Sequence, residues 1–215
     1  MSSANPQSEL RPSQFAALRS PAAILLFVLT TAIGLGLDLW SKSYAWNKLV
    51  FDPHLPLERD PYSGHLRVES DTATPIPGWL HFKVTVNEGA VFGLGQGNQM
   101  LFAIVSVAAI AFLTYLFATS GSRRVYQFIL GMLLAGVLGN LYDRMVFHYV
   151  RDMLYALPGR QWPGSNREIF PWIFNVADSL LCVGVGLMVI YSFFAHEHDP
   201  AAAKTDEPAA EPARS

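Results

Sequence analysis

Four stretches of the chain are almost entirely apolar, and each is close to the length of about 20 residues that a helix needs to cross a bilayer. They occupy residues 21–40, 99–119, 125–144 and 172–195. No proline interrupts them, and Pro21 and Pro171 stand at expected helix starts, where the missing N–H group does no harm. The pattern predicts an all-α polytopic membrane protein with four transmembrane helices.

Both ends of the chain differ from these stretches. Residues 1–20 and 196–215 are polar and rich in Pro, Ser or Ala, so we expect two flexible tails around one membrane domain, residues 21–195. Because Arg11 and Arg19 precede the first apolar stretch, it has some features of a cleaved signal peptide. It lacks a small-residue cleavage site and continues into DLWSKSYAW, so we expect it to remain as the first helix.

A strictly alternating segment precedes the second apolar stretch. Between Trp79 and Val86 the apolar positions are Leu80, Phe82, Val84 and Val86, separated by His81, Lys83 and Thr85. This period of two predicts a half-buried strand in a small extramembrane β-sheet. The preceding residues 51–78 are rich in proline and charge, so we expect them to be irregular, and the glycines at 89, 93, 95 and 97 predict tight turns.

The orientation in the membrane is predicted from one short loop. Residues 120–124 join the second and third apolar stretches and include Arg123 and Arg124. Positively charged short loops favour the cytoplasm. With four spans, this places both termini in the cytoplasm and the expected sheet on the non-cytoplasmic side.

Composition narrows the class of protein further. Hydrophobic residues make up 51% of the 215 residues and charged residues 15%, which is too apolar for an ordinary soluble domain. The net charge of −2 comes without a basic stripe, so we expect no nucleic-acid partner. The histidines lack metal-ligand spacing and Cys182 is the single cysteine, so we expect neither a metal site nor an internal disulfide.

Ionisable side chains within membrane-spanning helices are costly unless they face protein or water, and they are therefore functional candidates. The candidates are Asp38, Asp143, Arg144 and Asp178, accompanied by the amides Asn140 and Asn175. In a four-span chain, the end of the first helix, the start of the second, the end of the third and the start of the fourth share one membrane face. The polar residues occupy these ends, so we expect them to converge at one bilayer surface.

Two positions along the chain need separate arguments. Asp143 and Asp152 would lie on opposite sides of a continuous helix, so we expect the third helix to stop near Phe147 and FHYVRDML to be extended or turned. Asp152 would then lie over the mouth of the bundle. A fourth helix starting near Pro171 would place Asp178 about seven residues inside, roughly 10 Å at about 1.5 Å per residue.

Structural explanations remain open for several of these residues. Asp143 with Arg144 is compatible with an ion pair that locks the bundle, and Asp38 with Lys42, at i and i+4, with a helix-end pair. Asn87 is compatible with a simple turn. Ser179 has no histidine or lysine base in its motif, which argues against a nucleophilic serine. Position alone leaves catalysis, ion transport and packing open for Asp152 and Asp178.

Five sequence motifs along the chain resemble those of a known family. DLWSK, NEGAVFG, GNLYDR, VRDML and FNVADS resemble, in order and topology, the lipoprotein signal peptidases, or signal peptidase II, over residues 21–195. The resemblance implies a four-helix aspartic endopeptidase of the bacterial inner membrane without a metal or other cofactor. Its implied partners are diacylglyceryl-cysteine-modified prolipoproteins, from which it removes the signal peptide, and membrane phospholipid. We expect a monomer with its active site near the periplasmic face.

The same resemblance implies roles for individual residues. Asp152 and Asp178 would form the catalytic dyad. The residues implied to bind substrate or support the site are Asp38, Lys42, Asn87, Gly89, Asn140, Asp143, Arg144, Asn175 and Ala177. The chain departs from the family pattern at Val91, which replaces a usual alanine, and at Arg151 and Met153, which flank the first catalytic aspartate. Residues 157–168 also make a longer segment than is typical.

Two other classes compete with the peptidase interpretation. A small transporter or proton-relay protein would use Asp38, Asp143, Arg144 and Asp178 as its pathway, but the second apolar stretch contributes almost no polar residues to the other half of the membrane. A structural subunit of a membrane complex would leave the NEGAVFG and FNVADS blocks unexplained. A peptidase that cuts within spanning segments usually carries a GxGD motif, which this sequence lacks.

Overall fold

The computed structural model describes residues 15–54, 57–62, 64–89 and 98–196. Most of both expected tails lies outside these ranges, as do Val91 and the glycines at 93, 95 and 97. The expectation of a flexible tail is wrong for residues 16–19, which form the 3₁₀ helix η1 (Ala16–Arg19). Ala17 is fully buried in the core, and this burial holds the segment against the bundle.

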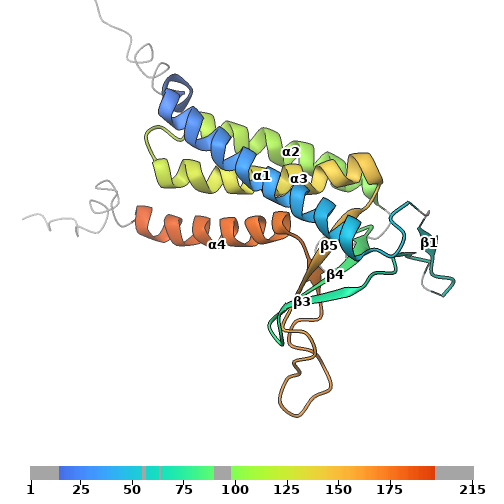
Figure 1. The fold of residues 1–215 in the computed structure, drawn as a ribbon. Helices are drawn as coiled ribbons and strands as arrows, with labels where there is room; N and C mark the ends of the chain where they lie inside the picture. Colours follow the sequence, from blue (N-terminus) through green and yellow to red (C-terminus); the bar gives the residue numbers. More distant parts are fainter. Residues whose placement is uncertain (1–14, 55–56, 63, 90–97, 197–215) are drawn as a thin grey trace, which may run out of the picture.

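Four helices form a bundle, and the strands lie at one end of it (Figure 1). All four helices are long and apolar enough to cross a membrane, as the hydrophobic pattern predicted. They are α1 (Pro21–Leu49), α2 (Gln99–Ala118), α3 (Arg124–Phe147) and α4 (Val176–His196). The third of these, α3, packs against each of the other three and is the central helix.

Two helix boundaries differ from the predictions. The helix α1 continues to Leu49 instead of ending near residue 40, and its extra turns bury Lys42 and Ala45. The helix α4 begins at Val176 rather than near residue 172, because Ile173 and Phe174 form the strand β6 instead. Asp178 therefore lies in the first turn of α4, and the predicted distance of about seven residues inside the helix is wrong.

The main sheet is antiparallel and four-stranded, in the order β3 (Thr72–Ile76), β4 (Leu80–Asn87), β5 (Val150–Ala156) and β6 (Ile173–Phe174). The predicted strand at 79–86 is confirmed as β4. The third helix ends at Phe147, as expected, and His148 stops it in a left-handed conformation with φ 66°. The chain then turns into β5, which pairs with β4 and carries Asp152.

The described residues between 51 and 78 are more regular than their composition predicted. The strand β1 (Glu58–Arg59) pairs with β2 (Leu66–Arg67) in a separate two-stranded sheet, and β3 adds to the main sheet. Main-chain pairing and contacts with the rest of the fold order a segment that is too polar to bury a core of its own. We refer to residues 58–67 as the β1–β2 hairpin.

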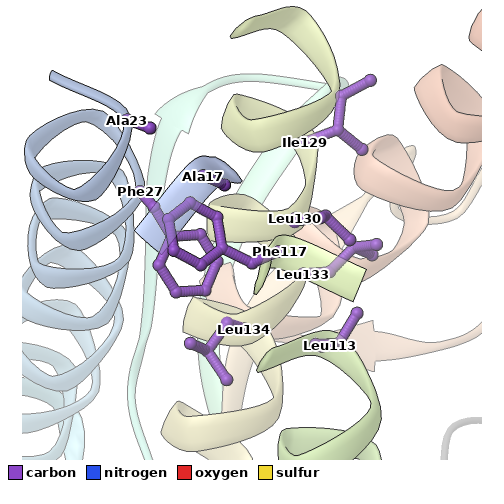
Figure 2. Packing of buried hydrophobic residues seen from close by; sticks show 9 residues of the cluster. All are labelled: Ala17, Ala23, Phe27, Leu113, Phe117, Ile129, Leu130, Leu133 and Leu134. Atoms are coloured by element: carbon purple, nitrogen blue, oxygen red, sulfur yellow. The ribbon is translucent and has the colours of Figure 1, made fainter. Parts of the chain in front are cut away.

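Two apolar clusters hold these parts together. The larger joins η1 to three helices, and Figure 2 shows the Phe27 ring from α1 stacked on Phe117 from α2, beside leucines of α3. The centroids of the two rings are 4.1 Å apart. The smaller cluster consists of Ala45, Val50, Val84 and Met153. Because it joins the extended end of α1 to β4 and β5, it fixes the sheet on the end of the bundle.

Candidate active site

The start of α4 is closed by a reciprocal pair of hydrogen bonds. The Asp178 N–H donates to Asn175 Oδ1 (2.9 Å), and the Asn175 N–H donates to Asp178 Oδ2 (3.3 Å). This is a capping box, which satisfies two N–H groups that a helix start would otherwise leave unpaired. The positive end of the helix dipole also favours a negative charge at this position. The sequence FNVADS therefore places a carboxylate at the mouth of the bundle.

Asp152 reaches the same place from the sheet. It lies opposite Thr85 in the β4–β5 ladder and is 2% exposed. Its Oδ1 accepts a hydrogen bond from Asn175 Nδ2 (2.6 Å), and its Oδ2 accepts one from Asn87 Nδ2 (3.2 Å). Burial, and next the negative charge of Asp178, raise the pKa of Asp152 to about 8.

A second layer of polar groups supports Asp178 from below. Asn140 Nδ2 donates to Asp178 Oδ1 (2.8 Å), while Asn140 Oδ1 accepts from Lys42 Nζ (3.0 Å). Lys42 is buried and lies 2.7 Å from Asp38 Oδ2. In such a chain each hydrogen bond polarises the next, so the lysine charge strengthens the donation from Asn140 to the carboxylate.

Asp38 also connects α1 to α4. Its Oδ1 accepts the N–H of Ala177 (2.8 Å), which is another unpaired donor of the α4 start. Gly139 of α3 lies beside it, and a Cβ at this glycine would clash with Asp38 Oδ2 and come within 3.2 Å of Ala177 Cβ. The three helices can therefore meet this closely only because residue 139 has no side chain.

Asp143 and Arg144 do not form the ion pair with each other that remained open from the sequence. Asp143 instead receives Arg151 Nη2 on Oδ1 (2.7 Å), with the Arg151 N–H and Nε on Oδ2 (2.9 and 3.2 Å), and Lys42 lies 3.6 Å away. Arg144 donates to the carbonyls of Asn140 (3.2 Å) and Gly89 (2.8 Å). Asp143 therefore holds the start of β5, and Arg144 holds the segment after β4.

The structure brings all the site residues expected from the sequence into this one network, which links Asp152 and Asp178 through Asn175. Two participants were not among them, Arg151 and Gly139. Arg151 stands next to Asp152 and differs from the family pattern, and this was the signal available in the sequence. Gly139 begins the GNLYDR block, but its role depends on contacts with two other helices, which the sequence alone does not reveal.

The chemical capacity of the site follows from these groups. Two carboxylates contact Asn175 at one end of the bundle, and the raised pKa of Asp152 favours one retained proton near neutral pH, which is the arrangement that acid–base hydrolysis by a carboxylate pair requires. Within the described part of the chain, no three His, Cys, Asp or Glu side chains form a group suited to a metal ion.

Comparison with known proteins gives a consistent result. The family model described as Signal peptidase (SPase) II matches residues 30–194. The lipoprotein signal peptidase of Rhodopirellula baltica is 36% identical over 196 residues, covering 84% of this chain and 77% of that protein. That of Lactobacillus gasseri is 38% identical over 130 residues, covering 60% of this chain and 78% of that protein.

The fold agrees as well. A bacterial membrane enzyme solved by the in meso method at 2.3 Å resolution superposes with a TM-score of 0.59 at 25% identity, covering 83% of this chain and 92% of the other. A second such structure, at 1.9 Å resolution, gives a TM-score of 0.55 at 24% identity, over 79% of this chain and 91% of the other. By the family model, the relatives and the fold together, the chain belongs to the signal peptidase II family.

Proposed function

As a signal peptidase II, the chain removes signal peptides from prolipoproteins by an aspartic mechanism, and we propose that Asp152 and Asp178 are its catalytic pair. One observation carries this assignment. Asn175 contacts both carboxylates, because its side chain donates to Asp152 and its backbone and side chain close the capping box with Asp178. A residue that holds both acids fixes their relative position on the sheet and on the bundle.

In the proposed mechanism, Asp178 is the ionised member and Asp152 the protonated one. The raised pKa of Asp152 and the polarised Lys42–Asn140 chain behind Asp178 support this division. Asp178 takes a proton from a water molecule while the oxygen of that water attacks the carbon of the scissile carbonyl. Asp152 donates a hydrogen bond to the carbonyl oxygen. When the C–N bond breaks, Asp178 gives the proton taken from water to the leaving nitrogen, so the products are a free amine and a carboxylic acid, which then ionises, and the pair is again singly protonated.

The surroundings of the pair suggest how substrate is held. This chain, like its family, is a bacterial inner-membrane protein with four apolar helices. In our proposal the sheet and the dyad face the periplasm, both termini lie in the cytoplasm and the enzyme acts as a monomer. The diacylglyceryl chains stay in phospholipid beside the bundle, so only the modified cysteine and its neighbours reach Asp152 and Asp178.

The substrate class is tested with two precursors of identical sequence, one diacylglyceryl-modified at its cysteine and one unmodified. Purified protein in lipid is expected to release the signal peptide from the modified precursor at least about 100-fold faster, because the acyl chains position the scissile bond at the bilayer surface. Peptide release is followed by mass spectrometry. Equal rates on the two precursors would contradict the lipid-dependent part of the proposal.

The pH dependence of cleavage follows from the pKa of Asp152. A pair with one proton is the active form, and with the pKa of Asp152 raised to about 8 the proton is retained at neutral pH and lost above that value. We therefore expect kcat/KM to fall as the pH rises through about 8, roughly tenfold per pH unit beyond it. A profile measured from pH 5 to 10 that stayed flat across pH 8 would exclude a protonated Asp152 as the acid.

A further inference from the structure

Glu88 is a carboxylate beside the site that the mechanism does not use. It lies between Asn87 and Gly89, and only 8% of its surface is exposed. Its Oε1 accepts Arg59 Nη2 (2.9 Å), while its Oε2 accepts Arg59 Nη1 (3.2 Å) and the Leu66 N–H (3.0 Å). All three donors belong to the β1–β2 hairpin, so one nearly buried side chain joins this hairpin to the end of β4.

The two neighbours of Glu88 contact the site directly. Asn87 Nδ2 donates to Asp152 Oδ2 (3.2 Å), and the carbonyl of Gly89 accepts from Arg144 Nη2 (2.8 Å). The Gly89 N–H also donates to Asn87 Oδ1 (2.9 Å), which fixes the orientation of the asparagine amide. A displacement of Glu88 therefore moves both the Asn87 amide, which donates to Asp152, and the Gly89 carbonyl, which accepts from Arg144.

We propose that Arg59 is a positioning residue, which acts through Glu88 to hold Asn87 and Gly89 in the geometry that the catalytic pair needs. The proposal rests on the assignment of Asp152 to that pair. It gives the β1–β2 hairpin an indirect part in the reaction, which is transmitted by Glu88 to Asn87 and Gly89.

The geometry of the contact between Arg59 and Glu88 suits this positioning role. A two-point contact between a guanidinium and a carboxylate fixes both distance and plane, which a single contact does not. Arg59 Nη1 also donates to the Gly64 carbonyl (2.8 Å), so the turn of the hairpin orients the guanidinium. Burial alone would raise the pKa of Glu88, but the Leu66 N–H and the Arg59 charge outweigh it and lower the pKa, so Glu88 stays ionised.

Arg59 is also a favourable residue to replace. Its side chain is 60% exposed, whereas that of Glu88 is 9% exposed, so its removal leaves no cavity in the apolar core. The guanidinium end of the pair is in solvent, and without Arg59 the Glu88 carboxylate still accepts the Leu66 N–H, so little stability is lost. The expected consequence is therefore a change in reaction rate with little change in unfolding temperature.

The test compares the cleavage of the lipid-modified precursor by wild type, Arg59→Gln, Arg59→Lys and Glu88→Gln. The matched control is Arg67→Gln, because Arg67 is an exposed arginine of the same hairpin. Arg59→Gln is expected to lower kcat about 10- to 100-fold, with KM changed less than about twofold and Tm unchanged. Arg59→Lys keeps the charge without the two-point contact, so its kcat should lie between those of wild type and Arg59→Gln. The double variant Arg59→Gln/Glu88→Gln should be no slower than the slower single variant, because both act through one contact.

Three results would overturn the inference: kcat of Arg59→Gln equal to that of Arg67→Gln, strictly additive losses in the double variant, or a loss of kcat that only accompanies a fall in Tm. Asp152→Asn is measured beside these variants. If Asp152→Asn cleaves normally, the catalytic assignment fails, whatever the Arg59 variants do. If it is inactive and the Arg59 variants behave like wild type, only the positioning role fails.

Discussion

Replacing Asp152 or Asp178 by asparagine is expected to reduce signal-peptide release by at least about 10³-fold, because the neutral amide neither accepts the proton of the attacking water nor donates an acidic one. The two substitutions preserve side-chain shape. Asparagine at 178 still offers an oxygen to the Asn175 N–H in the capping box. We therefore expect both variants to fold, with unfolding temperatures close to that of wild type.

The measurement is single-turnover release of signal peptide from the lipid-modified precursor, alongside thermal unfolding in the same detergent or lipid. Asp71→Asn is the matched control, because Asp71 is an exposed carboxylate directly before β3. It should cleave at the wild-type rate. A folded Asp152 or Asp178 variant that did the same would require another pair of groups to perform the chemistry.

Replacing Lys42 by methionine is expected to lower the free energy of unfolding by about 3–5 kcal/mol, which corresponds to a fall in Tm of roughly 10 °C. Lys42 has no exposed side-chain surface and lies 2.7 Å from Asp38 and 3.6 Å from Asp143. Without it, Asp38 is left as a buried carboxylate without its lysine partner, and Asn140 Oδ1 loses one of its two donors and keeps only Asn175 Nδ2. The loss of the charge, rather than of volume, causes the effect.

Two further variants separate charge from packing. Lys48→Met changes an exposed lysine of the same helix and should leave Tm unchanged. Adding Asp38→Asn to Lys42→Met removes the unpaired carboxylate while keeping an oxygen for the Ala177 N–H, so Tm should recover in part. If Lys42→Met alone unfolded at the wild-type temperature, the buried ion pair would have no measurable part in stability.

Much of this site was predictable from helix alternation. Asp38, Asn140 and Asp178 are far apart in the sequence, but three apolar helices that alternate across a membrane must bring these ends to one face, and the hydrogen bonds between them agree. The alternation of apolar residues also predicted β4, and the angular separation of Asp143 from Asp152 predicted that the third helix ends before Asp152. These inferences needed only local periodicity and topology.

Where the structure differs from the sequence-based predictions, the causes are contacts between distant parts of the chain. Pro171 was used as a helix start, whereas the pairing of β6 with β5 keeps residues 173–174 extended and leaves Asn175 as the helix cap. The N-x-x-D spacing of FNVADS was the better local signal for that boundary. The partner of Asp143 was also missed, because Arg151 reaches it only after the chain has reversed direction at His148.

The strands β5 and β6 pair at Leu154 with Phe174 and at Tyr155 with Ile173, and these paired residues flank the segment 157–172. This segment is a loop whose two ends are joined beside the site. Closing a loop twice as long costs only about 0.6 kcal/mol more in chain entropy. Insertions or deletions beyond the paired stem can therefore accumulate during evolution without changing the spacing of Asp152 and Asp178, which makes the tip of this loop a suitable site for attaching a label or an affinity tag.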